Sequence, residues 1–182
     1  MKNNLLNWLT KFKEDTTASL TVEFVLILPV LVTWFIGSIV FFDAFNSKAT
    51  AQRTAHTIAD IISRQTNTNN AFIDTLLLVQ NRMLPREDVG TVRVSSLQRD
   101  GDGNLSLSWT HSSDALSTPL ILTDIPASAL PDIADNESIL IVDTTVPFEP
   151  ISEWVGFTLT QWENRVAIKP RFVEPLQNSD FP

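Results

Sequence analysis

The sequence predicts an α+β fold in which a long N-terminal transmembrane helix continues beyond the membrane and packs on a small, mostly antiparallel sheet. Three observations support this class. Residues Phe24–Phe42 form a nineteen-residue run without a formal charge, and residues 43–64 contain neither Pro nor Gly. From Thr91 onward, the apolar residues recur at every second position, as in strands. A length of 182 residues allows one ordinary domain in addition to the helix.

The first predicted element is a membrane span at about residues 20–42, in which Glu23 is the single charged residue. About 20 apolar residues are enough to cross ~30 Å of hydrocarbon as a helix. A buried helix of a soluble protein fits less well, because such helices rarely stay apolar around their whole circumference. A cleaved secretory signal also fits less well, since Ala49–Ala51 lies well beyond an unusually long apolar core. We expect Pro29 to bend the span slightly.

The charges that flank the span predict its orientation. Lys2, Lys11 and Lys13 precede it, whereas Lys48 and Arg53 follow it. Positive charge favours the cytoplasmic side of a membrane. We therefore expect a single-pass protein with a cytoplasmic N-terminus and a C-terminal head outside the inner membrane.

A short motif at the start of the span is more specific than its hydrophobicity. Ala18 ends a polar leader, Ser19 follows it, and Glu23 and Phe24 stand four and five positions after Ser19. A carboxylate beside hydrocarbon is costly unless it reaches the interface or finds a partner. Cleavage between Ala18 and Ser19 would create an amine that the Glu23 of a neighbouring helix could bind, so that Glu23 would set the assembly register. Alternatively, Glu23 reaches the interface from an uncleaved anchor.

The stretch Ser-Leu-Thr-Val-Glu-Phe-Val-Leu-Ile-Leu-Pro at residues 19–29 resembles the class III signal peptides of type IV pilins. More narrowly, it resembles the TadE/TadF-like minor pseudopilins of the Tad (Flp, tight adherence) pilus systems. The family usually has Gly before the cut, where this chain has Ala18. The resemblance implies a pilin-like fold and a leader at residues 1–18 that a prepilin peptidase removes. It also implies as partners other pilins and minor pseudopilins, the inner-membrane assembly platform and membrane lipid.

Beyond the span, the pattern predicts a spine helix over residues 19–64, an α+β head over 65–176 and a loose tail over 177–182. Ala44, Ala51, Ala55, Ile58 and Ile62 share one face of the spine. Further elements are expected at the following ranges: a loop at 65–70, a helix at 71–84 with Phe72, Leu76, Val79 and Met83 in register, strands at 91–99, 105–110, 138–146 and 165–173, and between Pro119 and Pro131 a short helix or turn capped by Asp124 or Ser128.

The strand half also resembles the family, more weakly. Its features are a Val-Arg-Val-Ser strand from Val92, an aromatic residue at Phe148, and the motif Lys169-Pro170-Arg171, for which the family commonly has Arg-Pro-Arg. Lys169 and Arg171 follow a stretch, residues 100–164, that holds eleven acids and no Lys or Arg. We expect this basic pair to contact acids of the same subunit or of the next one.

Asp100, Asp102 and Asn104 are spaced like the first three ligands of a calcium-binding loop, with side-chain oxygens at alternate positions. The twelfth position, which should be Glu, is His111. Asp-Gly and Gly-Asn are also preferred hairpin turns, so the sequence favours a turn over a calcium site.

Composition excludes several functions. Without Cys, the chain has no thiolate nucleophile or thiolate metal site, and His56 and His111 belong to no catalytic motif. We therefore expect no enzyme, no metal and no cofactor. A net charge of -8 argues against nucleic acid as a partner. Trp154, Phe157 and Trp162 form either core or a partner surface.

The sequence thus predicts a minor pseudopilin that acts in assembly of a Tad/Flp pilus, a system related to type II secretion. Three alternatives remain: an uncleaved membrane-anchored scaffold of the same apparatus, a calcium-dependent adhesin-like module, and a membrane-tethered enzyme. The enzyme would require a catalytic cluster that the sequence lacks.

Overall fold

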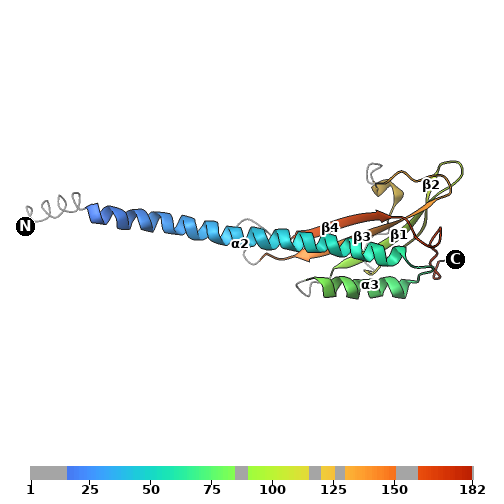
Figure 1. The fold of residues 1–182 in the computed structure, drawn as a ribbon, viewed down its shortest axis with the longest axis horizontal. Helices are drawn as coiled ribbons and strands as arrows, with labels where there is room; N and C mark the ends of the chain where they lie inside the picture. The colour runs from blue at the N-terminus through green and yellow to red at the C-terminus, as the bar shows by residue number, and fades with distance from the viewer. Residues whose placement is uncertain (1–15, 85–89, 115–119, 126–129, 151–159, 182) are drawn as a thin grey trace, which may run out of the picture.

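A single long helix, α2 (Thr16–Ser63), forms the spine of the protein in the computed structural model, which describes residues 16–84, 90–114, 120–125, 130–150 and 160–181. At ~1.5 Å per residue, its 48 residues extend for about 72 Å. The N-terminal half projects from the head as a bare stem, and the C-terminal half lies along the head (Figure 1). The α+β class is confirmed.

The face that α2 presents to the head is the predicted one. Ala44 is 4% exposed, and Ala51, Ala55, Ile58 and Ile62 are fully buried. These residues recur at intervals of three, four and seven, which places them on one side of a helix. Small side chains at Ala51 and Ala55 allow the backbone of α2 to approach the sheet closely.

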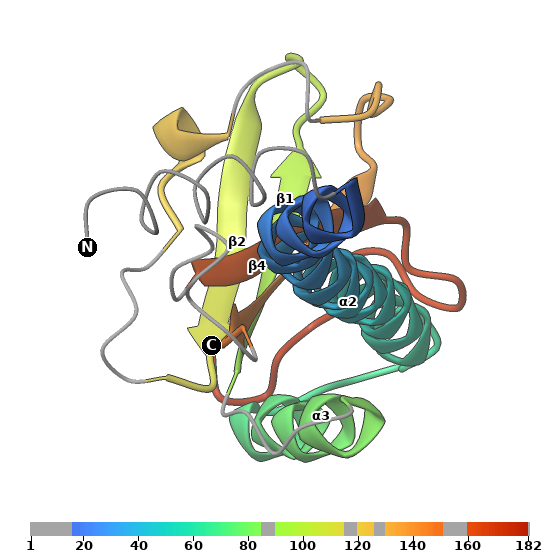
Figure 2. The ribbon, with the colours of Figure 1, turned by 90° about the vertical axis from the view of Figure 1, so that its left-hand side faces the viewer.

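The second helix, α3 (Asn70–Met83), lies beside α2 (Figure 2). It begins where Asn69 Oδ1 accepts a hydrogen bond from the Phe72 backbone at 2.7 Å, a common N-cap. Its buried face differs from the predicted one: Ile73, Leu76 and Gln80 are buried, whereas Met83 is exposed. The reason is that the Gln80 amide donates to the Thr145 carbonyl at 3.2 Å, which turns this polar residue inward.

Four antiparallel strands form one sheet in the order β2-β1-β3-β4. The predicted hairpin is confirmed as β1 (Thr91–Arg99) and β2 (Leu105–Ser112), and β3 (Ser138–Phe148) occupies the expected buried position. The register changes between Ser96 and Leu97, where β1 carries an irregularity opposite β2.

The prediction for the last strand is wrong in its bounds. Strand β4 covers Thr160–Ile168 rather than residues 165–173. It pairs with β3 from Thr160 opposite Phe148 to Ile168 opposite Leu140. Pro170 has no N–H to give to a strand ladder, so the chain leaves the sheet there.

Two hydrophobic cores cover the two faces of the sheet. The larger lies between the helices and the sheet, and it includes Ile58, Leu76 and Val142. The smaller lies on the opposite face, where Leu97 and Ile141 contact residues of the long β2–β3 connection. That connection contains the 3-10 helix η1 (Leu122–Asp124), as expected.

The expected caps of this short helix and the expected tail need correction. Residue Ile121 precedes η1 and forms no side-chain cap, while Asp124 is the last residue of the helix. Ser128 lies outside the described residues. The tail is not loose over residues 177–181, because the Thr68 backbone donates to Gln177 at 3.0 Å and accepts from Ser179 at 2.9 Å. Asn178 is 2% exposed and forms a parallel bridge with Thr68.

Candidate functional site

The N-terminal motif lies on the free end of α2. Ala18 and Ser19 fall within the bounds of the helix, which begins at Thr16. Glu23 is exposed, and Phe24 beside it is 59% exposed. Glu23 follows Ser19 by four positions, which corresponds to about 6 Å along the helix axis.

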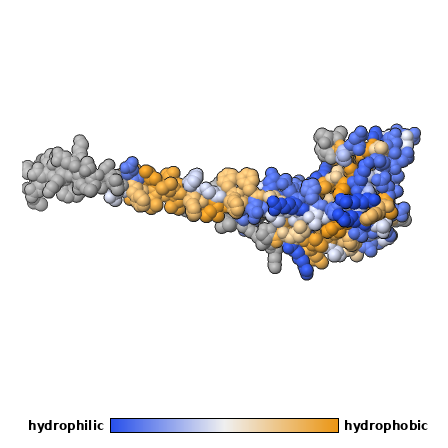
Figure 3. Space-filling view, viewed as in Figure 1, coloured by the Kyte–Doolittle hydropathy of each residue, from blue (hydrophilic) through white to orange (hydrophobic). Residues whose placement is uncertain are grey.

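The stem that follows this motif is apolar on its surface. Every residue from position 21 to 36 is exposed, and among them are Leu26, Val30 and Trp34. The space-filling view shows an orange stem that joins a largely blue head (Figure 3). A helix this long and apolar is consistent with a single-pass membrane anchor.

Pro29 is accommodated without a break in the helix. Its carbonyl accepts a hydrogen bond from Thr33 Oγ1 at 2.8 Å, four residues further on. Side-chain hydroxyls that bond to the preceding turn in this way are common where a helix must satisfy its own polar groups. The bend expected at Pro29 stays a prediction.

The Lys169-Pro170-Arg171 motif fastens the C-terminal end of the spine to the head. Arg171 donates from its backbone to the carbonyl of Ser63, the last residue of α2, at 2.8 Å. Its guanidinium bonds to Asp60 at 2.6 Å, and Pro170 is buried. Lys169 forms an ion pair with Glu137. Both basic residues therefore bind acids of their own subunit.

Glu137 and Lys169 shift each other's titration. The hydrogen bond from Lys169 holds the pKa of Glu137 below its ordinary value of 4.5. The same hydrogen bond raises the pKa of Lys169 above its ordinary 10.5. Both shifts follow from the stabilisation of the charged forms by the pair.

Sequence reasoning missed the partners of this motif. Asp60 and Arg64 are spaced i,i+4 and form an ion pair at 2.8 Å, a signal that was present in the sequence. Nothing local marks Glu137 or the Ser63 carbonyl, because their contacts with Lys169 and Arg171 depend on the tertiary fold.

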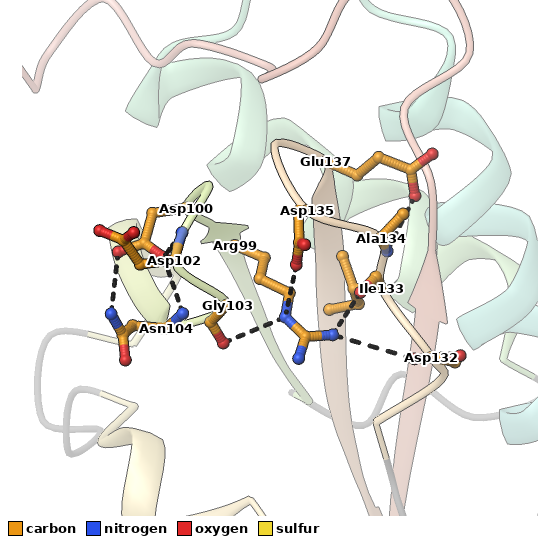
Figure 4. Close-up of polar contacts among 10 residues, drawn as sticks. All are labelled: Arg99, Asp100, Asp102, Gly103, Asn104, Asp132, Ile133, Ala134, Asp135 and Glu137. Atoms are coloured by element: carbon orange, nitrogen blue, oxygen red, sulfur yellow. Dashed lines mark hydrogen bonds and ion pairs between the residues drawn. The ribbon is translucent and has the colours of Figure 1, made fainter.

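The Asp100–Asn104 loop is a closed turn (Figure 4). Asp100 Oδ1 accepts from the backbones of Asp102 at 3.0 Å and Asn104 at 2.7 Å, and the Asn104 amide donates to Oδ2 at 3.2 Å. The pKa of Asp100 is held below its ordinary value of 3.8, chiefly by the hydrogen bond from the Asn104 backbone. Gly103 has a φ of 84°, a conformation that favours glycine. The loop's own donors thus occupy the carboxylate that calcium would need, and the geometry supports the turn.

Arg99 closes this loop from the side of the β2–β3 connection (Figure 4). Its Nε donates to the Gly103 carbonyl at 3.1 Å, and Nη1 donates to the Ile133 carbonyl at 2.6 Å. The carboxylates of Asp132 and Asp135 lie 3.9 and 3.4 Å from the guanidinium. A bound cation would have to share this site with Arg99, which disfavours calcium further.

A second charge cluster, which the sequence did not reveal, lies on the sheet face that turns away from α2. Arg93, Asp143 and Arg165 are directly opposite one another across β1, β3 and β4. Asp143 accepts from Arg93 Nη2 at 2.7 Å and from Arg165 Nε at 2.6 Å. These residues help to line a polar groove of about 530 Å³.

The remaining candidates for chemistry have structural surroundings. His111 Nε2 lies 2.9 Å from Asp74 Oδ1 and links β2 to α3, while His56 is exposed on α2. Among the described residues, no group of three or more His, Asp or Glu side chains could hold a metal ion. Trp162 packs against Phe148 with ring centroids 5.6 Å apart, and Trp154 and Phe157 lie outside the described residues.

Comparison with known families finds a similarity over one part of the chain, the spine. The family model of TadE-like proteins matches residues 18–60. The match begins at Ala18, includes Glu23 and Phe24, and ends near the C-terminus of α2. It confirms the TadE-like resemblance of the spine, and it does not extend over the strands. No curated protein and no solved structure matches the chain.

The match makes the spine similar to TadE-like proteins, a family associated with the Tad pilus. Proteins of that family are of a structural, non-enzymatic kind and interact with other components of the pilus system. The matched segment is the exposed stem and the face of α2 that packs on the head. The similarity is thus concentrated in the part of the chain that can contact membrane and neighbouring helices.

Proposed function

We propose that this chain is a minor pseudopilin that acts in assembly of a Tad pilus, anchored by α2 in the inner membrane with its N-terminus in the cytoplasm and its head in the periplasm. The observation that carries the proposal is the family match from residue 18, over a stem on which Glu23 is the single charge between Leu20 and Phe42. Other pilins, other minor pseudopilins and the assembly platform are its partners.

In this proposal a prepilin peptidase cleaves between Ala18 and Ser19, and the new amine of one subunit binds Glu23 of a neighbour. An ionised carboxylate at depth in a bilayer costs up to about 3 kcal/mol, which an ion pair offsets. A neighbour displaced by about 6 Å along the helix axis brings the amine level with Glu23. Glu23 then sets the register of adjacent helices, and Phe24 packs beside it.

The structure also offers one argument for an uncleaved scaffold of the same apparatus. Helix α2 begins at Thr16, so the proposed scissile bond lies inside its first turn. A peptidase needs an extended segment, and cleavage therefore requires this first turn to unwind. Helix ends fray readily, and so the cost of unwinding is small.

Intact mass of the membrane-extracted protein distinguishes the two. With an active prepilin peptidase, we expect a mass that lacks the first 18 residues. With an inactive peptidase, we expect the mass of the full chain. A full mass under both conditions would establish the uncleaved scaffold.

The register is tested by Glu23→Ala, with Thr21→Ala as the matched control two residues away on the same exposed stem. Loss of a pair worth about 1.4 kcal/mol or more lowers incorporation into the pilus at least tenfold. Incorporation is measured as the amount of the subunit in sheared pili. Equal incorporation of both variants would remove Glu23 from the mechanism.

A further inference from the structure

We propose that the foot of the head lies in the phospholipid headgroup layer and that Lys48 contacts lipid phosphates there. The foot comprises Ser47 and Lys48 of α2, Phe148 at the end of β3, and Trp162 near the start of β4. The inference rests on the proposed membrane anchorage and adds a second membrane contact, made by the head.

The length of the apolar stem places the foot at the membrane surface. Large exposed apolar side chains continue along α2 from Val22 to Phe45. These 24 positions extend for about 36 Å, whereas the hydrocarbon layer is ~30 Å thick. With Val22 at one hydrocarbon boundary, the other falls near Phe42, and Lys48, about 9 Å further along the axis, falls at the outer part of the headgroup layer.

The head overlaps this apolar zone. Val40 is 1% exposed and Ala44 is 4% exposed, although Phe41 and Phe42 between them are exposed. One side of α2 is thus covered by protein at a depth where its other sides face lipid. Toward the C-terminus of α2, the same side becomes the face that packs on the sheet through Ala51 and Ala55.

The side chains of the foot have the chemistry of an interfacial site. The Trp162 indole donates to Ser47 Oγ at 3.2 Å, and its ring packs on Phe148. The Lys48 ammonium lies 5.7 Å from the centre of the Trp162 ring. Trp combines an apolar ring with one donor and is enriched at membrane interfaces. A cation over an aromatic ring keeps its full charge available to an anion.

The distribution of ion pairs points the same way. Bases at the far end of the head bind acids of the chain: Arg64 and Arg171 bind Asp60, and Lys169 binds Glu137. Among the described residues, Lys48 and Arg53 have no carboxylate partner within ion-pair distance, and both follow the apolar run. A cation without an acidic partner beside an apolar surface fits lipid phosphate, whose attraction acts over about a Debye length of ~10 Å.

Spin labels can measure the depth of the foot, because the chain has no native cysteine. The full chain is reconstituted, one copy per nanodisc, in phosphatidylethanolamine with phosphatidylglycerol. Single labels are placed at Gln161→Cys beside Trp162, at Leu31→Cys in the stem and at Asp102→Cys on the hairpin. Collisions with oxygen and with a water-soluble nickel chelate give the depth of each label.

We expect the Leu31 label in hydrocarbon, the Asp102 label in water, and the Gln161 label at phosphate depth with at least threefold fewer nickel collisions than Asp102. Lys48→Gln should move the Gln161 label toward water, whereas Arg64→Gln, which removes a base paired with Asp60, should not. A Gln161 label as accessible as Asp102, while Leu31 is buried, overturns the inference and leaves the anchorage intact.

Three other results also count against the inference. A Leu31 label in water removes the anchorage itself. Protection of Gln161 that requires several copies per disc assigns the foot to a neighbouring subunit instead of lipid. An unchanged depth in Lys48→Gln overturns the phosphate contact.

Discussion

Replacing Asp143 tests whether the cross-strand charge cluster stabilises the head. The carboxylate accepts hydrogen bonds from Arg93 at 2.7 and 3.1 Å and from Arg165 at 2.6 and 3.3 Å. The side chain of Asp143 is 15% exposed, and those of Arg93 and Arg165 are 22% and 29% exposed. Asp143→Asn keeps the shape but leaves two adjacent guanidinium groups without their shared anion.

The magnitude follows from this partial burial. Removal of one partner from a fully buried ion pair costs about 3–5 kcal/mol, whereas exposed pairs contribute about 0–1 kcal/mol. The cluster lies between these limits, and hydrogen bonds to charged groups contribute about 1.5–3 kcal/mol. We expect Asp143→Asn to lower the free energy of unfolding of the head by about 2–3 kcal/mol, which corresponds to a Tm lower by about 5–10 °C.

The assay is thermal and urea unfolding of the detergent-solubilised full chain, followed by the fluorescence of its five Trp residues, of which Trp109 is 5% exposed in the main core. The control is Asp132→Asn, since this carboxylate is fully exposed and lies 3.9 Å from Arg99. Its loss should cost at most about 0.5 kcal/mol. If Asp143→Asn destabilises the head no more than Asp132→Asn does, the cluster does not stabilise the fold and our reasoning from burial fails.

Two further predictions concern the contact between α2 and the sheet and the ion pair between Glu137 and Lys169. Ala55→Leu overfills the buried contact between α2 and the sheet and should lower the free energy of unfolding in urea by about 1–3 kcal/mol. Gln52→Leu, at an exposed position of the same helix, should lower it by less than about 0.5 kcal/mol. Equal effects of the two variants would mean that the contact is loosely packed. Because the folded pKa of Glu137 is depressed, its pair with Lys169 stabilises the fold above pH 4.5 and the stabilisation is lost as pH falls through the folded pKa. Glu137→Gln should weaken the loss of Tm below pH 4.5, and an identical acid profile in both proteins would contradict this assignment.

The sequence predicted those parts of the fold that follow from local patterns. The buried face of α2 could be read from a spacing of three and four residues, and the β1–β2 hairpin from alternation around a turn at Asp100–Asn104. Strand β4 was misplaced because alternation alone does not show where a strand leaves the sheet, and Pro170 was the overlooked signal. The inward turn of Gln80 depends on a carbonyl 65 residues away, which no local pattern shows.

The candidate site also contains residues that a local pattern reveals and residues that only the tertiary structure reveals. Ala18, Ser19, Glu23 and Phe24 lie within seven consecutive residues, so a local sequence motif located them, and the family match covers them. The Arg93, Asp143 and Arg165 cluster becomes visible only once the register of three strands is known. Contacts that depend on register or on chain segments far apart are set by tertiary packing, and a single sequence carries no record of that packing.

The two parts of α2 impose different limits on assembly. From residue 21 to 36 every position is exposed, so neighbouring helices can pack on any side of this part of the stem. From Gly37 onward, one side of α2 is buried, and small residues such as Ala44 and Ala51 allow the head to lie close to the helix. Lateral contacts beyond Gly37 are therefore restricted to the uncovered sides, which carry Phe41, Phe42 and Phe45. In the proposed assembly, a neighbour registered by Glu23 is free to approach from any direction at that level, and the buried side of α2 limits those directions about 20 Å further along the helix.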